Sequence, residues 1–215
     1  MASRHKLIVG VDYGIAWMPT QGVGVNDINI ISDWAGGARA HEHLEKVPSQ
    51  IAYSAENPSL ESDTWGYEVK PGTRAYCWRK LLLDSRTLAT EYDDPSLQEA
   101  SGGAALKVPA HKKPVNVVAD FLKHLYEHCM SRIEKTVPPD VLRLTPIDFW
   151  FTMPAIWSDE AQHATKSAAE RAGFGQRVGD TISMITEPEA AALAAFKTTK
   201  ERYDNLLEVC PRPNF

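Results

Sequence analysis

An α/β fold is predicted from the order in which three kinds of segment follow one another. Short apolar runs separated by turns fill residues 6–53, an amphipathic stretch covers residues 115–135, and two strand–turn–helix units follow at residues 147–173 and 182–196. Short apolar runs indicate strands, and apolar stripes at i, i+3, i+4 and i+7 indicate helices. With 215 residues, the chain can bury a core as one domain or two small ones.

The composition narrows the class of protein. A formal net charge of −5 argues against a general nucleic-acid binder, and 24% charged with 43% hydrophobic residues is ordinary for a soluble globular protein. Cys77, Cys129 and Cys210 have no metal-ligand spacing, so a reducing compartment, the cytoplasm or the nucleus, is expected. The apolar run 7–11 is too short for a signal peptide, and none approaches the roughly 20 residues of a membrane span.

The N-terminal segments predict a β-meander. Residues 6–11 form an apolar strand that ends at Asp12, and strand-like runs follow at residues 15–17, 25–31 and 47–53. An acid at a strand end before a glycine, here Asp12 and Gly14, is either a turn former or one side of a metal–phosphate site. No dinucleotide-binding or Walker glycine loop is present.

The middle of the chain predicts one short strand, two helices and a connector. Residues 65–67 are expected as the strand, residues 74–83 as a helix bearing Arg79 and Lys80, residues 84–113 as a connector of low order, and residues 115–135 as the clearest long helix.

Four histidines in two pairs raise the question of a metal site. His124 and His128 are four residues apart on the second helix, a spacing that could bind a metal, but no third ligand is visible. Surface histidines are the favoured interpretation, as they are for His41 and His43 in a loop.

The C-terminal third contains the two strand–turn–helix units. Residues 147–153 predict a strand, Ser158 an N-cap, residues 159–173 a helix with small residues on one face, and Gly173 its stop. Residues 182–185 predict a further strand, followed by an alanine-rich helix with Pro188 in its first turn. We expect that helix to be tightly packed in the core, with Glu187 either starting the helix or pointing into a cleft.

Four stretches in this order resemble the ATPase domain of the heat shock protein 70 family (the heat-shock 70-kDa chaperones), and are most similar to its divergent fungal branch. They are Ile8-Val-Gly-Val-Asp-Tyr-Gly14, Val47-Pro-Ser-Gln-Ile-Ala-Tyr53, residues 153–165 through Ala172-Gly173, and Ile185-Thr-Glu-Pro-Glu-Ala-Ala-Ala-Leu193. The resemblance implies a ribonuclease-H-like fold of the actin-like ATPase superfamily, with a mixed sheet, β-hairpins and flanking helices. Residues 1–200 would be its first lobe and residues 201–215 an out-of-family tail.

The resemblance also implies ATP and Mg²⁺ as ligands. It places Asp12, with Tyr13 and Gly14, near the Mg²⁺ and phosphates, and Glu187 where it helps to hold the Mg²⁺ and the attacking water. Lys80 would match the lysine that orients this water, and Pro154 the proline that relays nucleotide state. Carboxylates suit hydrated Mg²⁺, and a lysine can steady the attacking oxygen.

Three departures from the family pattern bear on activity. The family continues its first strand with Asp-x-Gly-Thr-Thr-x-Ser, whereas here Gly14 is followed directly by Ile15, so phosphate-binding donors are missing. Gln162 replaces an interdomain arginine. The second lobe and the substrate-binding domain are also expected to be absent, because the chain has 215 residues.

Three interpretations follow. The first is a truncated relative of an ATP-binding chaperone with little or no ATP hydrolysis, whose partners would be unfolded clients or co-chaperones. The second is a non-catalytic module that docks on another chaperone, and the third is an incomplete gene-model fragment with a mis-spliced Gly14–Ile15 junction. A sugar kinase of the same superfamily is a weaker alternative. Self-association through an exposed lobe face is expected, and no nucleic acid or membrane is expected as a partner.

Overall fold

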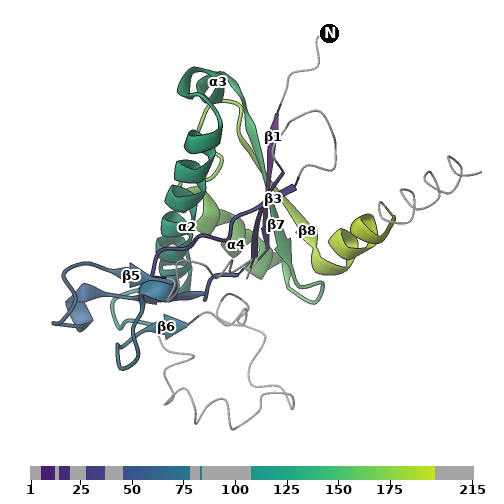
Figure 1. Ribbon diagram of the computed structural model, residues 1–215. Coiled ribbons are helices and arrows are strands. Elements are labelled where there is room, and N and C mark those ends of the chain that lie inside the picture. Colours follow the sequence, from purple (N-terminus) through teal and green to yellow (C-terminus); the bar gives the residue numbers. More distant parts are fainter. Residues whose placement is uncertain are drawn as a thin grey trace, which may run out of the picture.

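The computed structural model of the chain describes residues 6–12, 15–19, 28–36, 46–77, 83 and 108–196. Its main feature is a five-stranded sheet with the strand order β3-β2-β1-β7-β8 (Figure 1). The strands are β1 (Leu7–Asp12), β2 (Ile15–Pro19), β3 (Ile28–Ile30), β7 (Ile147–Met153) and β8 (Thr181–Thr186). β1, β2 and β3 pair antiparallel, whereas β7 pairs parallel with both β1 and β8. The predicted α/β class and mixed sheet are confirmed.

The antiparallel part of this sheet is the predicted meander. β1 and β2 lie where the apolar runs indicated strands. β3 (Ile28–Ile30) lies within the predicted strand 25–31, of which residues 25–27 are outside the described part. The fourth predicted strand, at residues 47–53, is shorter in the structure and belongs to a different sheet. It is β4 (Gln50–Ala52), in a three-stranded sheet ordered β5-β4-β6.

One face of the large sheet forms the core. β7 alternates strictly, with Ile147, Phe149 and Phe151 fully buried and Trp150 on the opposite face 37% exposed. The helices α2 (Pro114–Thr136) and α4 (Asp159–Ala172) pack against each other and cover the buried face (Figure 1). The opposite face, which carries Ile8 and Trp150, has no described helix over it.

The two long helices begin and end where the sequence signals predict. α2 starts with Pro114 in its first turn and buries its apolar stripe, from Val118 to Ile133, against the sheet. In α4 the Ser158 side chain accepts a hydrogen bond from the Ala161 backbone N–H, and Gly173 ends the helix with a left-handed φ of 113°. Ala161, Ala168 and Ala169 are fully buried, so small side chains let α4 approach its neighbours closely.

The smaller sheet corrects one prediction. Residues 74–77 are not helical, because Tyr76–Cys77 forms strand β6, which pairs with β4, while residues 78–82 lie outside the described part. The Asn57 side chain bonds both the carbonyl and the N–H of Arg74, and the Tyr76 hydroxyl donates to Glu56 at 2.6 Å. These contacts with residues far away in sequence override the helical spacing of the segment.

The segment expected as a strand at residues 65–67 is also different in part. β5 (Thr64–Trp65) ends at Trp65, and η2 (Gly66–Glu68) is a 3-10 helix that begins at Gly66 with a φ of 55°. A second short 3-10 helix, η1 (Ser54–Glu56), follows β4. After α2, the sequence Pro138-Pro139 starts a further helix, α3 (Pro139–Leu144), which was not predicted.

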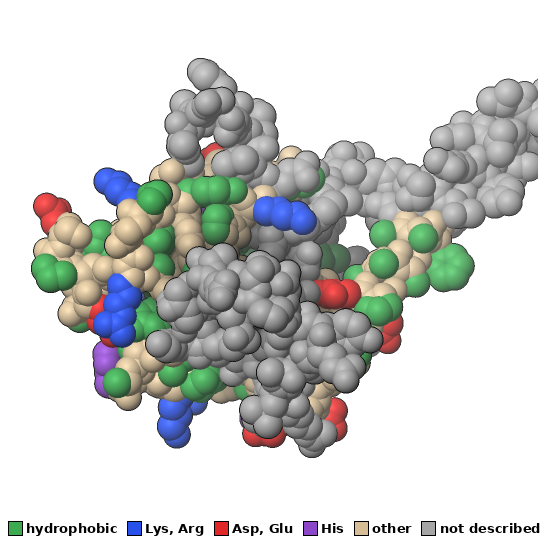
Figure 2. Space-filling view, turned by 90° about the horizontal axis from the view of Figure 1, so that it is seen from below, with side chains coloured by type: hydrophobic (Ala, Val, Ile, Leu, Met, Phe, Trp, Pro, Cys, Tyr) green, Lys and Arg blue, Asp and Glu red, His purple; other side chains and the backbone are tan. Residues whose placement is uncertain are grey.

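The alanine-rich helix is present but is not a core element. Residues 187–196 are helical, as predicted, with Pro188 in the first turn. Residues 191–196 are all exposed, including Leu193 at 62% and Phe196 at 73%. The expectation of a tightly packed core helix is therefore wrong, because small side chains permit close packing but do not supply a partner. In Figure 2 hydrophobic side chains of this helix stand out at the right of the molecule.

Candidate functional site

The carboxyl ends of three neighbouring parallel strands define the candidate site. β1, β7 and β8 run in the same direction and end at Asp12, Met153 and Thr186. Two helices begin at this edge, because α4 follows β7 after a short turn and helical residues 187–196 follow β8 directly. Ligands of open α/β sheets bind beyond the carboxyl ends of the strands, and helix N-termini there favour anions.

The strand register places two of the predicted acids at this edge. Val11 lies opposite Phe151, and Phe151 opposite Met184, so Asp12 is level with Thr152 and Ile185, two residues before Glu187. With β7 between them, the two backbones are separated by two strand spacings, roughly 10 Å. Carboxylates at that separation could bracket a hydrated Mg²⁺ ion, which keeps several of its waters in proteins.

The other predicted site residues lie outside the described part of the chain. Tyr13, Gly14 and Lys80 are not described, and Asp12 is described only by its backbone. Glu187 is half-buried at the first helical position after β8. The structure thus brings Asp12 and Glu187 to one edge of the sheet and leaves the roles of all five residues as predictions.

The strand-to-helix junction that positions Glu187 is fixed by a reciprocal cap. The Thr186 hydroxyl and backbone N–H both donate to Oε2 of Glu189, at 2.8 and 3.0 Å, and the Glu189 N–H donates to the Thr186 hydroxyl at 3.4 Å. The hydroxyl bond and then the backbone bond lower the pKa of Glu189. Thr186 and Glu189 have the Thr-x-x-Glu spacing of a capping box, which is the signal in the sequence for this contact.

The connection between β7 and α4 is equally well defined. The Trp157 N–H donates to the Pro154 carbonyl at 3.2 Å, and Ser158 then caps the helix. The Gln162 side chain donates to the Trp157 carbonyl at 3.4 Å. In this chain Gln162 therefore holds its own turn.

The paired histidines of α2 are packed against aromatic rings. His124 stacks on Trp65 with ring centroids 5.9 Å apart, and His128 stacks on Trp34 at 5.0 Å. Both are half-buried, so the interpretation as surface histidines is corrected. The described residues contain no group of three side chains that could hold a metal ion. His41 and His43 lie outside them.

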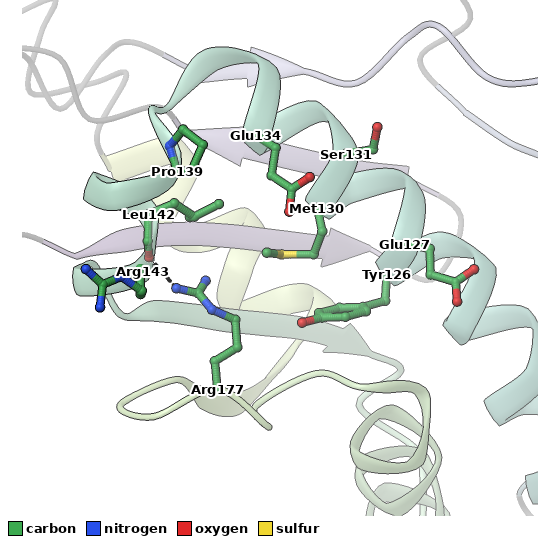
Figure 3. A pocket seen from close by; sticks show the side chains of 9 residues that line it. All are labelled: Tyr126, Glu127, Met130, Ser131, Glu134, Pro139, Leu142, Arg143 and Arg177. Carbon is green, nitrogen blue, oxygen red and sulfur yellow. Dashed lines mark hydrogen bonds between the residues drawn. The ribbon is translucent and has the colours of Figure 1, made fainter.

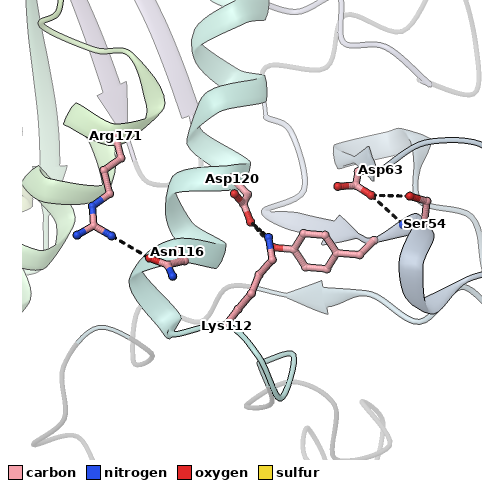
Figure 4. A network of polar contacts seen from close by, with 7 residues as sticks. Ser54, Asp63, Lys112, Asn116, Asp120 and Arg171 are labelled. Atoms are coloured by element: carbon pink, nitrogen blue, oxygen red, sulfur yellow. Dashed lines mark hydrogen bonds and ion pairs between the residues drawn. The ribbon is translucent and has the colours of Figure 1, made fainter.

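A polar network joins α2 to the smaller sheet (Figure 4). The Tyr53 hydroxyl donates to Asp120 at 2.7 Å, and Lys112 pairs with the same carboxylate at 2.6 Å while lying over the Tyr53 ring. Burial, followed by the bond to Asp120, raises the pKa of Tyr53. Tyr53, Asp120 and Lys112 are all partnered with one another, so the network fixes α2 against the end of β4.

One pocket of about 580 Å³ lies away from the strand-end edge (Figure 3). Residues of α2 and α3 line it together with Arg177, whose guanidinium donates to the carbonyls of Leu142 and Thr145. Leu142 and Thr145 precede β7, so the pocket is near the amino end of that strand. It is therefore distinct from the edge that carries Asp12 and Glu187.

Comparison with known proteins points to one group of chaperones. A chaperone protein HscA homolog of Actinobacillus pleuropneumoniae is 25% identical over 199 residues, which are 89% of this chain and 28% of that protein. The chaperone protein HscA homolog of Neisseria meningitidis is 27% identical over 89% of this chain. The chaperone protein DnaK of Thermosipho melanesiensis is 28% identical over 96% of this chain and 29% of its own length.

The chain thus spans less than a third of the length of these relatives. No family model matches it. Among the helices in the described part, none combines the length and apolar character needed to cross a membrane.

Proposed function

The chain is a sequence relative of the heat shock protein 70 family of chaperones, and we propose that residues 1–200 correspond to the first lobe of a chaperone nucleotide-binding domain of the ribonuclease-H-like fold. The support is the strand order β3-β2-β1-β7-β8 together with helices that begin at the carboxyl ends of β7 and β8. Residues 201–215 would lie outside this lobe.

Within this lobe, we propose that Asp12 and Glu187 face a hydrated Mg²⁺ ion. Tyr13 and Gly14 would lie beside the phosphates of ATP, and Lys80 would orient the attacking water. The support is the arrangement of Asp12 and Glu187 on either side of β7 at one sheet edge. Oxygen ligands from carboxylates suit this ion, and the N-terminal ends of two helices suit phosphate.

As it stands, this chain would bind Mg-ATP at best weakly and hydrolyse little or none. The observation that carries this proposal is the pairing of Asp12 with Ile15, which leaves only residues 13 and 14 between β1 and β2. A phosphate-binding turn needs several backbone N–H groups directed at the ligand, and two residues provide too few. Chaperone activity on unfolded clients, and contacts with co-chaperones, would require parts that lie beyond the length shared with the relatives.

A thermal melt with Mg-ATP separates a filled site from an unfilled one. The melting temperature of the purified chain should stay the same with and without millimolar Mg-ATP, while a full-length chaperone of the family should be stabilised under the same conditions. A clear increase in the melting temperature of this chain, abolished in Asp12→Ala, would contradict weak binding and call for a hydrolysis assay of Glu187→Ala.

A second candidate function, a non-catalytic module that docks on another chaperone or on a second copy, is favoured by the exposed helix after β8. Leu193 and Phe196 are 62% and 73% exposed, and exposed apolar groups on one element often mark an interaction surface. Sedimentation of the chain across a concentration range tests self-association. If the mass rises with concentration and Leu193→Asp abolishes this rise, the helix after β8 is supported as the self-association surface. The same rise in Leu193→Asp would exclude this helix as the surface.

A further inference from the structure

Five aromatic side chains join α2 to residues 31–36, which follow β3, and to β5. We call these five side chains the aromatic junction. They are Trp34, Trp65, Phe121, His124 and His128. Trp34 and Trp65 are each 7% exposed and meet edge to face at 6.3 Å. Because these tryptophans belong to segments far away from α2 in the sequence, their packing on one helix face holds the smaller sheet against the larger one.

The His128 ring is enclosed by both tryptophans. Its ring stacks on Trp34 at 5.0 Å and meets Trp65 at 6.1 Å in an edge-to-face arrangement. Among the described residues its Nε2 atom is buried and has no hydrogen-bond partner. A neutral imidazole can leave Nε2 as an unused acceptor, but an imidazolium would carry a buried N–H donor without an acceptor, which is costly.

The charges around His128 do not offset this cost. Asp33 in segment 31–36 and Glu68 in η2 favour the charged ring, but Asp33 is already paired with Arg132, and both Arg132 and Lys135 of α2 oppose a further positive charge. His124, one turn earlier on the same helix, faces Trp65.

Within the described part of the chain, stacking on Trp34 could favour a cation through the face of the indole ring. Burial is the largest effect, and it lowers the pKa of His128 below 6.5.

We propose that His128 is a pH-sensitive element of the aromatic junction, and that protonation of its ring loosens the packing of Trp34 and Trp65 on α2. Acidification would then release the segment around Trp34 and strand β5 from the helix before the larger sheet unfolds. Within the same core, Phe149 and Phe151 of β7 are fully buried and make their ring contacts with Tyr126 and Phe174, away from the two tryptophans.

The direction of the pH effect follows from the lowered pKa. The folded protein holds His128 neutral while the unfolded chain still binds a proton, so the stabilisation is complete above pH 6.5 and is lost as pH falls through the lowered pKa. One proton changes the ratio of folded to unfolded protein by at most about tenfold per pH unit.

The test combines a titration with local hydrogen exchange on the full chain. NMR titration of the histidine ring protons, assigned with the variant His128→Phe, should give His128 a pKa below 6.5. Hydrogen exchange should then show that residues 31–36 and 64–68 lose protection between pH 7.5 and pH 5.5, while residues 147–153 stay protected. Exchange rates are corrected for the intrinsic effect of pH on exchange.

Two variants separate this role from simple packing. His128→Phe keeps a ring in the junction but cannot titrate, so its segments should keep their protection at pH 5.5. His124→Gln should behave like the unmodified chain. A pKa at or above 6.5 for His128, or equal loss of protection in His128→Phe, would overturn the proposal. If His128→Phe does not fold, triple-resonance spectra of the unmodified chain can assign the ring protons instead. The pKa of His128 and the local loss of protection in the unmodified chain then still decide whether the proposal holds.

Discussion

The backbone of Asp12, the last residue of β1, lies directly opposite Ile15, the first residue of β2. Because of this pairing, only two residues connect β1 to β2, at the edge of the sheet where β7 and β8 also end. The acid that would face Mg²⁺ is thus in place at the strand end, but the chain leaves little room for the N–H donors that a triphosphate requires. The proposed weak nucleotide binding rests on this relationship.

The N-cap of α4 should contribute measurable stability. Ser158 accepts a hydrogen bond from the Ala161 N–H at 3.2 Å, so Ser158→Ala should lower the free energy of unfolding by about 1 kcal/mol. Urea denaturation at pH 7 measures the change. Ser167→Ala, on the same helix but away from the cap, should leave stability equal or slightly higher, because alanine is the better helix former. Equal losses in both variants would exclude a capping role for Ser158.

Phe174 should be one of the most sensitive core positions. Its ring is fully buried and lies 4.9–5.1 Å from the rings of Tyr126, Phe149 and Phe151. Phe174→Ala should cost roughly 3–5 kcal/mol, and Phe174→Leu less, because leucine leaves a smaller cavity.

The exposed Phe196 offers the matched control for this prediction. Phe196 is 73% exposed, so Phe196→Ala should change the free energy of unfolding by less than about 0.5 kcal/mol. A large loss of stability in Phe196→Ala, measured by denaturant unfolding, would show that helical residues 187–196 are packed in solution.

The capping box after β8 should be detectable through the pKa of Glu189. Thr186→Val removes the hydroxyl that donates to Glu189, so the pKa of Glu189 should rise toward its ordinary value. Because the pKa of Glu189 is lowered in the folded protein, the carboxylate contributes stability that is present above pH 4.5 and is lost as pH falls through the lowered pKa. Thr186→Val should lose part of this stability. Carboxyl-carbon NMR titration measures this, with Thr186→Ser as the control that keeps the hydroxyl. An unchanged pKa in Thr186→Val would contradict the assigned contact.

Local signals made much of the fold predictable. α4 was predicted with its start and end, because Ser158, Gly173 and the alanines between them act within the helix itself. β1, β7 and β8 followed from their apolar runs. The strand at Tyr76 was missed because contacts with Glu56 and Asn57, distant in sequence, outweigh the spacing of its neighbours.

The candidate site was predictable only in part. The sequence pointed to Asp12 and Glu187 separately, and the parallel register brings their backbones to one edge. The stacking of His124 and His128 could not be foreseen, because Trp65 and Trp34 reach α2 only through the fold. Likewise, nothing in the alanine-rich composition of residues 187–196 could tell that no described element would cover residues 191–196.

The most direct test of the proposed function is the thermal melt of the purified chain with and without millimolar Mg-ATP. A ligand present at about 100 times its dissociation constant stabilises a protein by about 2.7 kcal/mol, or roughly 5–10 °C for a domain of this size. We predict a cooperative melt with no shift beyond the scatter, because the connection between Asp12 and Ile15 is too short to bind the phosphates. A shift of several degrees that Asp12→Ala removes would contradict this account and show that a single lobe holds the nucleotide.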